Sequence, residues 1–408
     1  MRKKIYAAAG YTTVFFGSGR PEFNPKKPMP TFESYLTETA QGTCDQLKNC
    51  DFDEGVIGSF MSARFIKQAN LPAFLPFMVP DLYGKPCTAV EGACCTGSRA
   101  LATGIRSLLS DLADTAFVAG FEIQNCVKAV YGADILAGAA YYNGERKEGY
   151  AYFFPGIFAE RAGAYFQRYG EEDTRKAMAL WYEQAILNAR QNSKAQEYAN
   201  KSQDLYALGM TPPNPKRFLP YINNYDCSKV SDGAASIALA TEEGIKRLGI
   251  DSSNCIEVVA IGEAVADITK KPDDLTVLST TKIAVEKALA RANISLNEIS
   301  VLELHDCFTI TAILALEAIG YAKPGEGRYF ISEGNTRKDG AIPTNLSGGL
   351  GGFGHPTGAT GVRQLVDLQK QLTGSAENQI KPRTPYGMMV NMGGNDKTVT
   401  CLIVKKSQ

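Results

Sequence analysis

Apolar residues along this chain follow two alternating spacings. Between residues 87 and 122, a short apolar run precedes four aliphatic residues that share one helix face, Leu101, Ile105, Leu108 and Leu109. Spacings of three and four residues indicate a helix, and the continuous apolar run at 115–120 indicates a buried strand. The stretch is therefore predicted to form a strand, a tight turn, a helix and a strand, which is typical of an α/β protein.

The same order of elements returns in the C-terminal part of the chain. The pattern predicts strands at 231–240, 257–262 and 300–303, and helices at 280–292 and 311–319. In both halves a strand runs into a turn that carries a cysteine and then into a helix. Two similar halves would place these helix N-termini at one shared crevice.

Residues 126–225 break the repeat. Aromatic residues crowd the segment between Tyr141 and Tyr169, and 173–203 is polar with helical spacing. We interpret this segment as an inserted, mainly helical lid. The N-terminal half is then 1–125 together with 226–255, and the C-terminal half is 256–408.

Composition excludes several classes of function. Lys plus Arg equals Asp plus Glu, at 43 each, so no charge excess marks the chain for nucleic acid or an anionic membrane. No 18 consecutive apolar residues occur, so no membrane span is expected. The ten cysteines form no CxxC pair and only two histidines are present, which argues against a zinc or other metal site. The absence of a disulfide pattern favours a reducing compartment, the cytoplasm.

The candidate chemistry involves thiols and imidazoles. Cys94 lies in the first cysteine-bearing turn, where a helix N-terminus favours a thiolate; the alternative is a small buried apolar residue. His305 lies in the motif HDCF, and His355 lies in a glycine-rich loop, GGLGGFGHPTGATG, at 348–361. An imidazole titrates in the range needed to accept a proton from a nucleophilic thiol.

Four motifs occur in the order in which one known family carries them: CCTG at 94–97, DCSKVSDGAA at 226–235, HDCF at 305–308, and GHP at 354–356 followed by TGATG. Together they resemble the thiolase superfamily over essentially the whole chain. The HDCF form is similar to its sterol-carrier-protein-2 type branch. The resemblance implies a thiolase fold, in which two α/β halves form a five-layered αβαβα core.

The resemblance also implies roles for individual residues. Cys94 matches the nucleophile that takes the acyl group, and His355 matches the histidine that activates it and contributes to an oxyanion hole. His305 is similar to the histidine that helps to bind the thioester oxygen. Backbone N–H groups near Cys94 and Gly393 would form the second oxyanion hole. Cys95 is interpreted as a packing residue.

One departure concerns the second catalytic thiol. Common thiolases carry an acid/base cysteine in a C-terminal CxG loop, where this chain has Asn391. In the HDCF branch the cysteine of that motif takes over, which nominates Cys307. Cys401, the nearest remaining thiol, is expected in the core. Phe308 and Gly354 are candidates for binding substrate or coenzyme A.

The substrate is less defined. The aromatic residues of the lid form either its core or the wall of a pocket for an aromatic acyl group. Four cations, Arg146, Lys147, Arg161 and Arg217, are candidates for a substrate carboxylate or for coenzyme A phosphates, although surface charge also explains them. Lid and motif are similar to those of benzoylsuccinyl-CoA thiolases of anaerobic toluene degradation; acetoacetyl-CoA or an aliphatic 3-oxoacyl-CoA is the alternative substrate.

The family resemblance implies coenzyme A as a co-substrate, with no permanently bound cofactor. It also implies a homodimer and a small separate partner protein with an OB-fold and a zinc ribbon. Three other functions remain open: a decarboxylating condensing enzyme, a non-catalytic acyl-CoA-binding subunit, and a cysteine peptidase. Cys307 favours thiolysis over condensation, and the intact set of thiols and histidines favours an enzyme over a scaffold.

Overall fold

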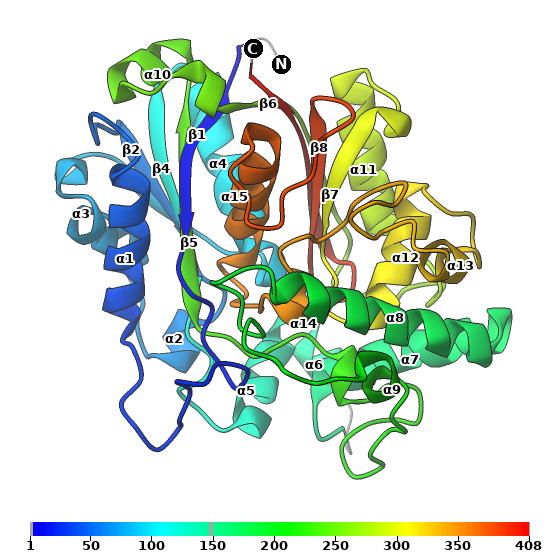
Figure 1. Ribbon diagram of the computed structural model, residues 1–408. Helices are drawn as coiled ribbons and strands as arrows, with labels where there is room; N and C mark the ends of the chain where they lie inside the picture. The colour runs from blue at the N-terminus through cyan, green and yellow to red at the C-terminus, as the bar shows by residue number, and fades with distance from the viewer. Residues whose placement is uncertain (1–2, 147–149, 408) are drawn as a thin grey trace.

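A computed structural model describes residues 3–146 and 150–407 of the chain (Figure 1). Lys147, one of the candidate cations, lies outside the described residues. Nine strands form one mixed sheet in the order β3-β2-β4-β5-β1-β6-β9-β8-β7. Their bounds are β1 Tyr6–Thr12, β2 Glu54–Gly58, β3 Cys87–Val90, β4 Thr115–Glu122, β5 Gly233–Ala240, β6 Ile256–Val265, β7 Ile299–Leu304, β8 Tyr386–Gly393 and β9 Thr398–Lys406.

Two half-sheets meet at β1. The strands β3, β2 and β4 are parallel to one another, and β5 and β1 complete this half in antiparallel pairs. Tyr6 of β1 lies opposite Ala240 on one side and Glu257 of β6 on the other, so a short ladder joins the halves. In the second half β7 and β8 are parallel, and β9 pairs antiparallel with β8 and β6.

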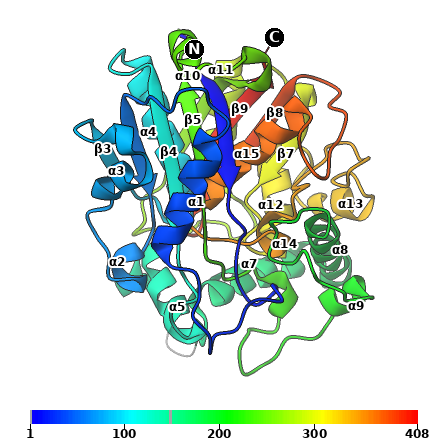
Figure 2. The same cartoon turned by 60° about the vertical axis from the view of Figure 1, so that its left-hand side comes forward.

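Helices cover both faces of each half-sheet and confirm the five-layered thiolase fold (Figure 1). The helices α4 (Thr96–Leu109) and α15 (Thr360–Thr373) lie between the half-sheets and pack against each other. The helix α1 (Phe32–Cys44) covers the outer face of the first half, as Figure 2 shows. On the outside of the second half lie α11 (Ser279–Ala292) and α12 (Thr309–Ile319).

Apolar spacing predicts a helix with one buried face, and the two central helices fit this prediction to different degrees. In α4 three residues of the predicted face, Leu101, Ile105 and Leu108, are fully buried, and the fourth, Leu109, is half-buried. In α15 even Arg363 and Gln364 have no exposed surface, because sheets cover this helix on both sides. Arg363 is compensated by Glu303 and Asp367, at 3.1 Å and 2.5 Å.

The segment predicted to be helical contains α5 (Ala129–Leu136), α6 (Tyr142–Glu145), α7 (Phe153–Tyr169), α8 (Glu171–Ala189) and α9 (Leu205–Gly209). Figure 1 shows these helices together at one end of the molecule. The shorter helices are α2 (Ser62–Phe65), α3 (Leu75–Met78), α10 (Glu242–Leu248), α13 (Gly327–Ser332) and α14 (Gly349–Gly352). The domain bounds drawn from the sequence stay a prediction.

Two further expectations concern the whole chain. Among the described residues no helix is both long and apolar enough to cross a membrane. The expectation of unpaired cysteines is wrong at one place, since Cys44 and Cys50 form a disulfide. Cys44 ends α1, and the turn that follows brings the two Cα atoms to 5.5 Å, a proximity that their spacing in sequence did not reveal.

Candidate active site

One cavity of about 570 Å³ brings together most of the site residues predicted from the sequence. It lies where strands from both halves end, since Cys94 lies in the turn after β3 of the first half and His305 follows β7 of the second. The predicted residues that line it are Cys94, Arg217, His305, Cys307, Phe308 and His355. Gly354 and Gly393 do not line it themselves, but each precedes a residue that does.

A tight turn presents Cys94 to this cavity. The turn Ala93–Cys95 joins the end of β3 to α4, and Ala93 has the left-handed backbone angle φ 55°. The Thr96 hydroxyl accepts a hydrogen bond from the N–H of Gly92 and donates to the carbonyl of Ala93. A left-handed non-glycine residue persists only where its surroundings hold it, so this backbone is over-determined around the nucleophile.

The resting thiol of Cys94 differs from the sequence prediction of a thiolate. Burial raises its pKa to about 12, and a hydrogen bond from the backbone N–H of Gly394 offsets this only in part. The helix dipole does not decide the protonation state here, because desolvation penalises the charged form more strongly. Cys94 therefore rests as a thiol and needs a base when it reacts.

Hydrogen bonds hold His355 in position to act as that base. Its backbone N–H donates to Ser231 Oγ at 2.9 Å, and its carbonyl accepts from Gln124 Nε2 at 2.9 Å. Gly354 has φ 122°, and a Cβ there would lie 2.6 Å from Ser231 Oγ, so this loop requires glycine. The Nδ1 of His355 lies 2.7 Å from Thr360 Oγ1, while Nε2 has no hydrogen-bond partner in the described protein. Burial lowers the pKa of His355 to about 3, so the ring is neutral.

The ring of His305 lies next to the ring of His355 and is steeply inclined to it. The two imidazole rings have centroids 5.2 Å apart and planes at 82°. Nδ1 of His305 is 2.9 Å from Nδ2 of Asn391. Burial, with smaller contributions from His355 and Arg363, lowers the pKa of His305 well below its usual value. Both imidazoles of the site are therefore neutral, as is the thiol of Cys94.

The turn that carries His305 and Cys307 is fixed by Asp306. Its carboxylate accepts from the N–H of Leu350 at 2.8 Å and from Nε1 of Trp181 at 3.0 Å. Cys307 is buried, with Sγ 3.7 Å from Thr311 Oγ1 in α12. Burial and the nearby Cys94 raise the pKa of Cys307 well above its usual value, so it also rests as a thiol. A thiol in this state is suited to donate a proton.

The cavity contains one thiol that the sequence did not single out. Cys227 lines it and pairs in a single β-bridge with Phe308. Cys95 has the opposite placement: it is fully buried, with Sγ 3.1 Å from Ser98 Oγ and 3.3 Å from the carbonyl of Asn391. Cys95 is thus a core residue, and so is Cys401, which has no exposed surface.

Cys94, His305 and His355 also have the spacing of metal ligands. Their ligand atoms all lie within 4.8 Å of one another, and among the described residues no other group of this kind is found. The same proximity serves proton transfer between a thiol and an imidazole. The prediction from the sequence remains that the site uses no metal.

The aromatic residues divide between the two interpretations offered by the sequence. Phe158 of α7 stacks on Phe308 with centroids 4.6 Å apart, and both line the cavity. Tyr152 stacks on Phe218, also at the cavity. Tyr165 and Phe166 are instead buried in the core. Part of the aromatic crowd is therefore a pocket wall, and part packs the lid.

The candidate cations divide similarly. Arg146 pairs with Asp134 at 2.8 Å, and Arg161 is fully buried, so neither is available at the cavity. Arg217 lines the cavity, and within the described residues no ion pair joins it. Lys128 lines the cavity as well. Lys229 lines it too but pairs with Glu197 at 3.0 Å, so among the described lining residues Arg217 and Lys128 are the cations left to meet an anionic ligand.

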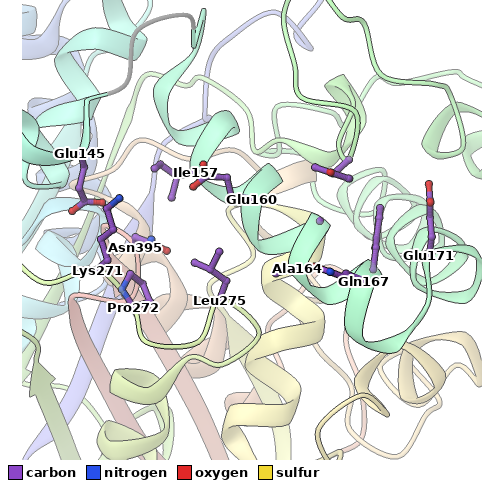
Figure 3. Close-up of a pocket in the computed structure, with 13 residues that line it drawn as sticks. Glu145, Ile157, Glu160, Ala164, Gln167, Glu171, Lys271, Pro272, Leu275 and Asn395 are labelled. Carbon is purple, nitrogen blue, oxygen red and sulfur yellow. The ribbon is translucent and has the colours of Figure 1, made fainter.

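A second, larger hollow of about 870 Å³ lies along another face of α7 (Figure 3). Its lining includes Ile157, Glu160, Gln167 and Lys271, and none of the predicted catalytic residues. Asn395 lines this hollow, whereas the preceding Gly394 lines the catalytic cavity. The turn after β8 therefore separates the hollow from the catalytic cavity. Because the hollow is the larger of the two, cavity volume alone does not identify the active site.

Sequence reasoning missed the buried carboxylate that holds the histidine loop. Glu122, at the end of β4, accepts hydrogen bonds from Thr357 Oγ1 at 2.8 Å and from the N–H of Gly358 at 3.2 Å. It also accepts from Ser59 Oγ and from the N–H groups of Phe60 and Met61. An acidic residue ending an apolar strand was the available signal, because a buried carboxylate requires donors around it.

Comparisons with known proteins agree with this geometry. Residues 262–406 match the family model described as thiolase C-terminal domain-like. An acetyl-CoA acetyltransferase of Methanothermobacter thermautotrophicus is 30% identical over 382 residues, which cover 92% of this chain and 95% of that protein. Human sterol carrier protein 2 is 28% identical over 61% of this chain and 44% of its own length.

Two further similarities are to a thiolase subunit and to a solved structure. The benzoylsuccinyl-CoA thiolase subunit BbsB of Thauera aromatica is 26% identical over 310 residues, which cover 76% of this chain and 77% of that protein. Among solved structures, the Ltp2-ChsH2(DUF35) aldolase superposes with a TM-score of 0.77 at 15% identity, covering 99% of this chain and 98% of that one. At this identity the superposition shows the fold alone.

Proposed function

We propose that this chain, which belongs to the sterol-carrier-protein-2 type branch of the thiolase superfamily, uses its acyltransferase chemistry to cleave a 3-oxoacyl-CoA with coenzyme A. One observation carries the proposal: the cavity joins a thiol from the first half, Cys94, to His305, Cys307 and His355 from the second. These groups supply a nucleophile, a base, a hydrogen-bond donor and a proton donor.

The first half-reaction forms an acyl-enzyme. Nε2 of His355 takes the proton of Cys94, and the sulfur attacks the ketone carbon of the substrate. The carbon–carbon bond between the ketone and the α-carbon then breaks. Cys307 protonates the departing carbanion, which leaves as the shorter acyl-CoA, while the other fragment remains on Cys94 as a thioester.

The second half-reaction returns the enzyme to its starting state. The Cys307 thiolate deprotonates coenzyme A, whose sulfur attacks the thioester on Cys94. Cys94 leaves as a thiolate and recovers its proton from His355. Backbone N–H groups at Cys94 and at Gly393 or Gly394 stabilise the oxyanion of each tetrahedral intermediate, and His305 donates to the thioester oxygen.

The pocket supports an aromatic, carboxylate-bearing substrate of the benzoylsuccinyl-CoA type. The stacked pair Phe158 and Phe308 offers flat apolar surface in the cavity that contains Cys94, and Arg217 offers a cation in the same cavity. The similarity to the subunit from Thauera aromatica favours the same substrate. The archaeal relatives favour acetoacetyl-CoA as the alternative.

The deciding experiment measures coenzyme A-dependent cleavage of acetoacetyl-CoA, a long 3-oxoacyl-CoA and benzoylsuccinyl-CoA, with products identified by mass. We expect benzoyl-CoA and succinyl-CoA as the preferred products. Cys94→Ala should form no acyl-enzyme, whereas the matched variant Cys95→Ala should still form it. Preferred cleavage of an aliphatic substrate would overturn the aromatic proposal and leave the chemistry intact.

The assembly proposal comprises a homodimer and a small OB-fold and zinc-ribbon partner protein. The structural relative contains a DUF35 component, and the relative from Thauera aromatica is named as a subunit. Because Cys94 must stay reduced to act, we place the enzyme in the cytoplasm. Identical size-exclusion profiles and activities with and without the partner would contradict this part of the proposal.

A further inference from the structure

The two active-site histidines have different partners at the same ring position. In His355, Nδ1 faces Thr360 Oγ1 at 2.7 Å, and this hydroxyl donates its own proton to the carbonyl of Pro356 at 3.0 Å. The hydroxyl oxygen can therefore only accept, which puts the imidazole proton on Nδ1. Nε2 of His355, which has no hydrogen-bond partner among the described residues, then carries a lone pair, as a base requires.

In His305 the same nitrogen faces an amide donor. Asn391 presents Nδ2 to Nδ1 of His305 at 2.9 Å. Its Oδ1 lies 2.7 Å from Ser98 Oγ, at the start of α4. This is the shorter of the two acceptor contacts of that hydroxyl, the other being the carbonyl of Cys95 at 3.0 Å, so the hydroxyl donates to Oδ1 and orients the amide. An amide nitrogen only donates, so Nδ1 of His305 must accept, and the proton of this neutral ring lies on Nε2.

We propose that Asn391 is a positioning residue that holds His305 in the Nε2–H form, so that His305 is a hydrogen-bond donor while His355, set by Thr360, is the base. This inference rests on the roles proposed above for the two histidines. It gives a function to the residue that replaces the CxG cysteine. Where common thiolases have the CxG thiol, this chain has an amide that controls the tautomer of His305.

The surroundings of Asn391 are built for this contact. Asn391 has no exposed surface, and it lies in β8 opposite Thr400 of β9. A Cβ on Gly361 would lie 2.6 Å from Asn391 Oδ1 and 2.2 Å from the backbone nitrogen of Ser98. The absence of a side chain at Gly361 lets α15, α4 and β8 meet around this amide.

The test uses histidine labelled with ¹⁵N, which is practical because the chain has only two histidines. Solid-state NMR of the full-length protein distinguishes protonated from unprotonated ring nitrogens, and His355→Gln assigns the signals. In the wild type we expect the proton of His305 on Nε2 and that of His355 on Nδ1. A wild-type His305 with its proton on Nδ1 would overturn the proposal.

Variants then connect the tautomer to the reaction. Asn391→Leu should give a mixture of His305 tautomers and reduce kcat by about 10²-fold to 10³-fold, the usual effect of losing one oxyanion donor. Alkylation of Cys94 by iodoacetamide should stay at the wild-type rate, since His355 is unchanged. Thr400→Val is the matched control: it is the cross-strand neighbour, touches Cys95 but neither histidine, and should keep both the tautomers and kcat.

Ser98→Ala tests the same idea if Asn391→Leu does not fold. Without the hydroxyl that orients it, the amide can turn, and the His305 signals should become mixed. Unchanged His305 signals in either variant would contradict the proposal. The spectra and the alkylation need no acyl-CoA, so they judge this inference even if the proposed substrates are not cleaved.

Discussion

At the scale of single residues, burial decides the chemistry of the site. Cys94, Cys307 and both histidines are all held in their neutral forms by desolvation. No ion pair of thiolate and imidazolium is formed at rest. We therefore expect the proton to move from the thiol to the imidazole only when substrate is bound. The nucleophilic thiol of Cys94 is thus kept in its neutral, less reactive form.

This protonation state predicts the pH dependence of labelling. Because the pKa of Cys94 is raised to about 12, its thiolate is a minor species at neutral pH and increases as the pH rises. The rate of alkylation by iodoacetamide should therefore rise about tenfold per pH unit between pH 7 and 9. Peptide mass spectrometry measures it, with the exposed Cys126 as an internal comparison. A rate that is flat above pH 6 would instead indicate a preformed ion pair.

The two remaining cavity thiols give a second prediction. Cys307→Ala should form the acyl-enzyme slowly and reduce kcat by about 10²-fold to 10⁴-fold, the usual contribution of a general acid/base. Cys227→Ala is the matched control, since it removes a thiol from the same cavity and should change kcat little. Equal losses in both variants, measured in the coenzyme A assay, would refute the assignment of the proton donor to Cys307.

At the scale of elements, α7 is tied to the turn between β8 and β9. Arg161 of α7 donates from Nε to Asn395 Oδ1 at 2.6 Å and from Nη1 to the carbonyls of Leu275 and Val277, at 2.8 Å and 3.1 Å. Asn395 directly follows Gly394, whose N–H faces Cys94. A buried guanidinium therefore fixes the backbone that supports the nucleophile.

Arg161→Met should consequently affect both stability and catalysis. It leaves buried acceptors without a donor, which costs about 1–3 kcal/mol in the free energy of unfolding. It should also reduce kcat about tenfold or more, since a displaced N–H weakens an oxyanion hole. Thermal unfolding and steady-state kinetics measure the two effects.

Arg168→Met provides the control from the same helix. Arg168 contacts Asp274 and Thr276, in the same loop, but it does not reach the turn that contains Gly394. Its loss should leave kcat unchanged. If Arg161→Met and Arg168→Met lowered kcat equally, the effect would belong to the loop and not to the turn.

At the scale of the whole molecule, the sheet ends in a free edge next to the nucleophile. Within the part of the chain that the structure describes, β3 pairs with β2 alone, and its Thr88 and Ala89 are exposed. An exposed edge strand offers unpaired backbone groups to another chain. We expect the homodimer interface to lie at this edge, where the second subunit would support the turn after β3 that carries Cys94.

A charge on this edge should therefore separate the subunits. Ala89→Lys is expected to shift the protein from dimer to monomer in light scattering after size exclusion, and to reduce activity through the Cys94 turn. Leu112→Lys adds the same charge at another exposed site and should remain dimeric. A dimeric Ala89→Lys protein would place the interface elsewhere.

The sequence alone determined the position of several elements and nominated the residues of the candidate site. Period and composition located β4, α4, α11 and α12 to within a few residues, since apolar spacing reports which face is buried. Motif order selected the family, and Cys94, Cys307, His305 and His355 of those motifs do meet in one cavity. Local signals sufficed for Cys94, His305 and Cys307, because each lies in a turn next to a predicted strand or helix.

Only the tertiary structure decided how these groups behave. The high pKa of Cys94, the opposite tautomers of the histidines and the buried supports Glu122, Asn391 and Arg161 depend on contacts between residues far apart in sequence. The same is true of the disulfide at the end of α1. Desolvation and hydrogen-bond partners are properties of packed neighbours, and a linear pattern of apolar and polar positions does not specify those neighbours.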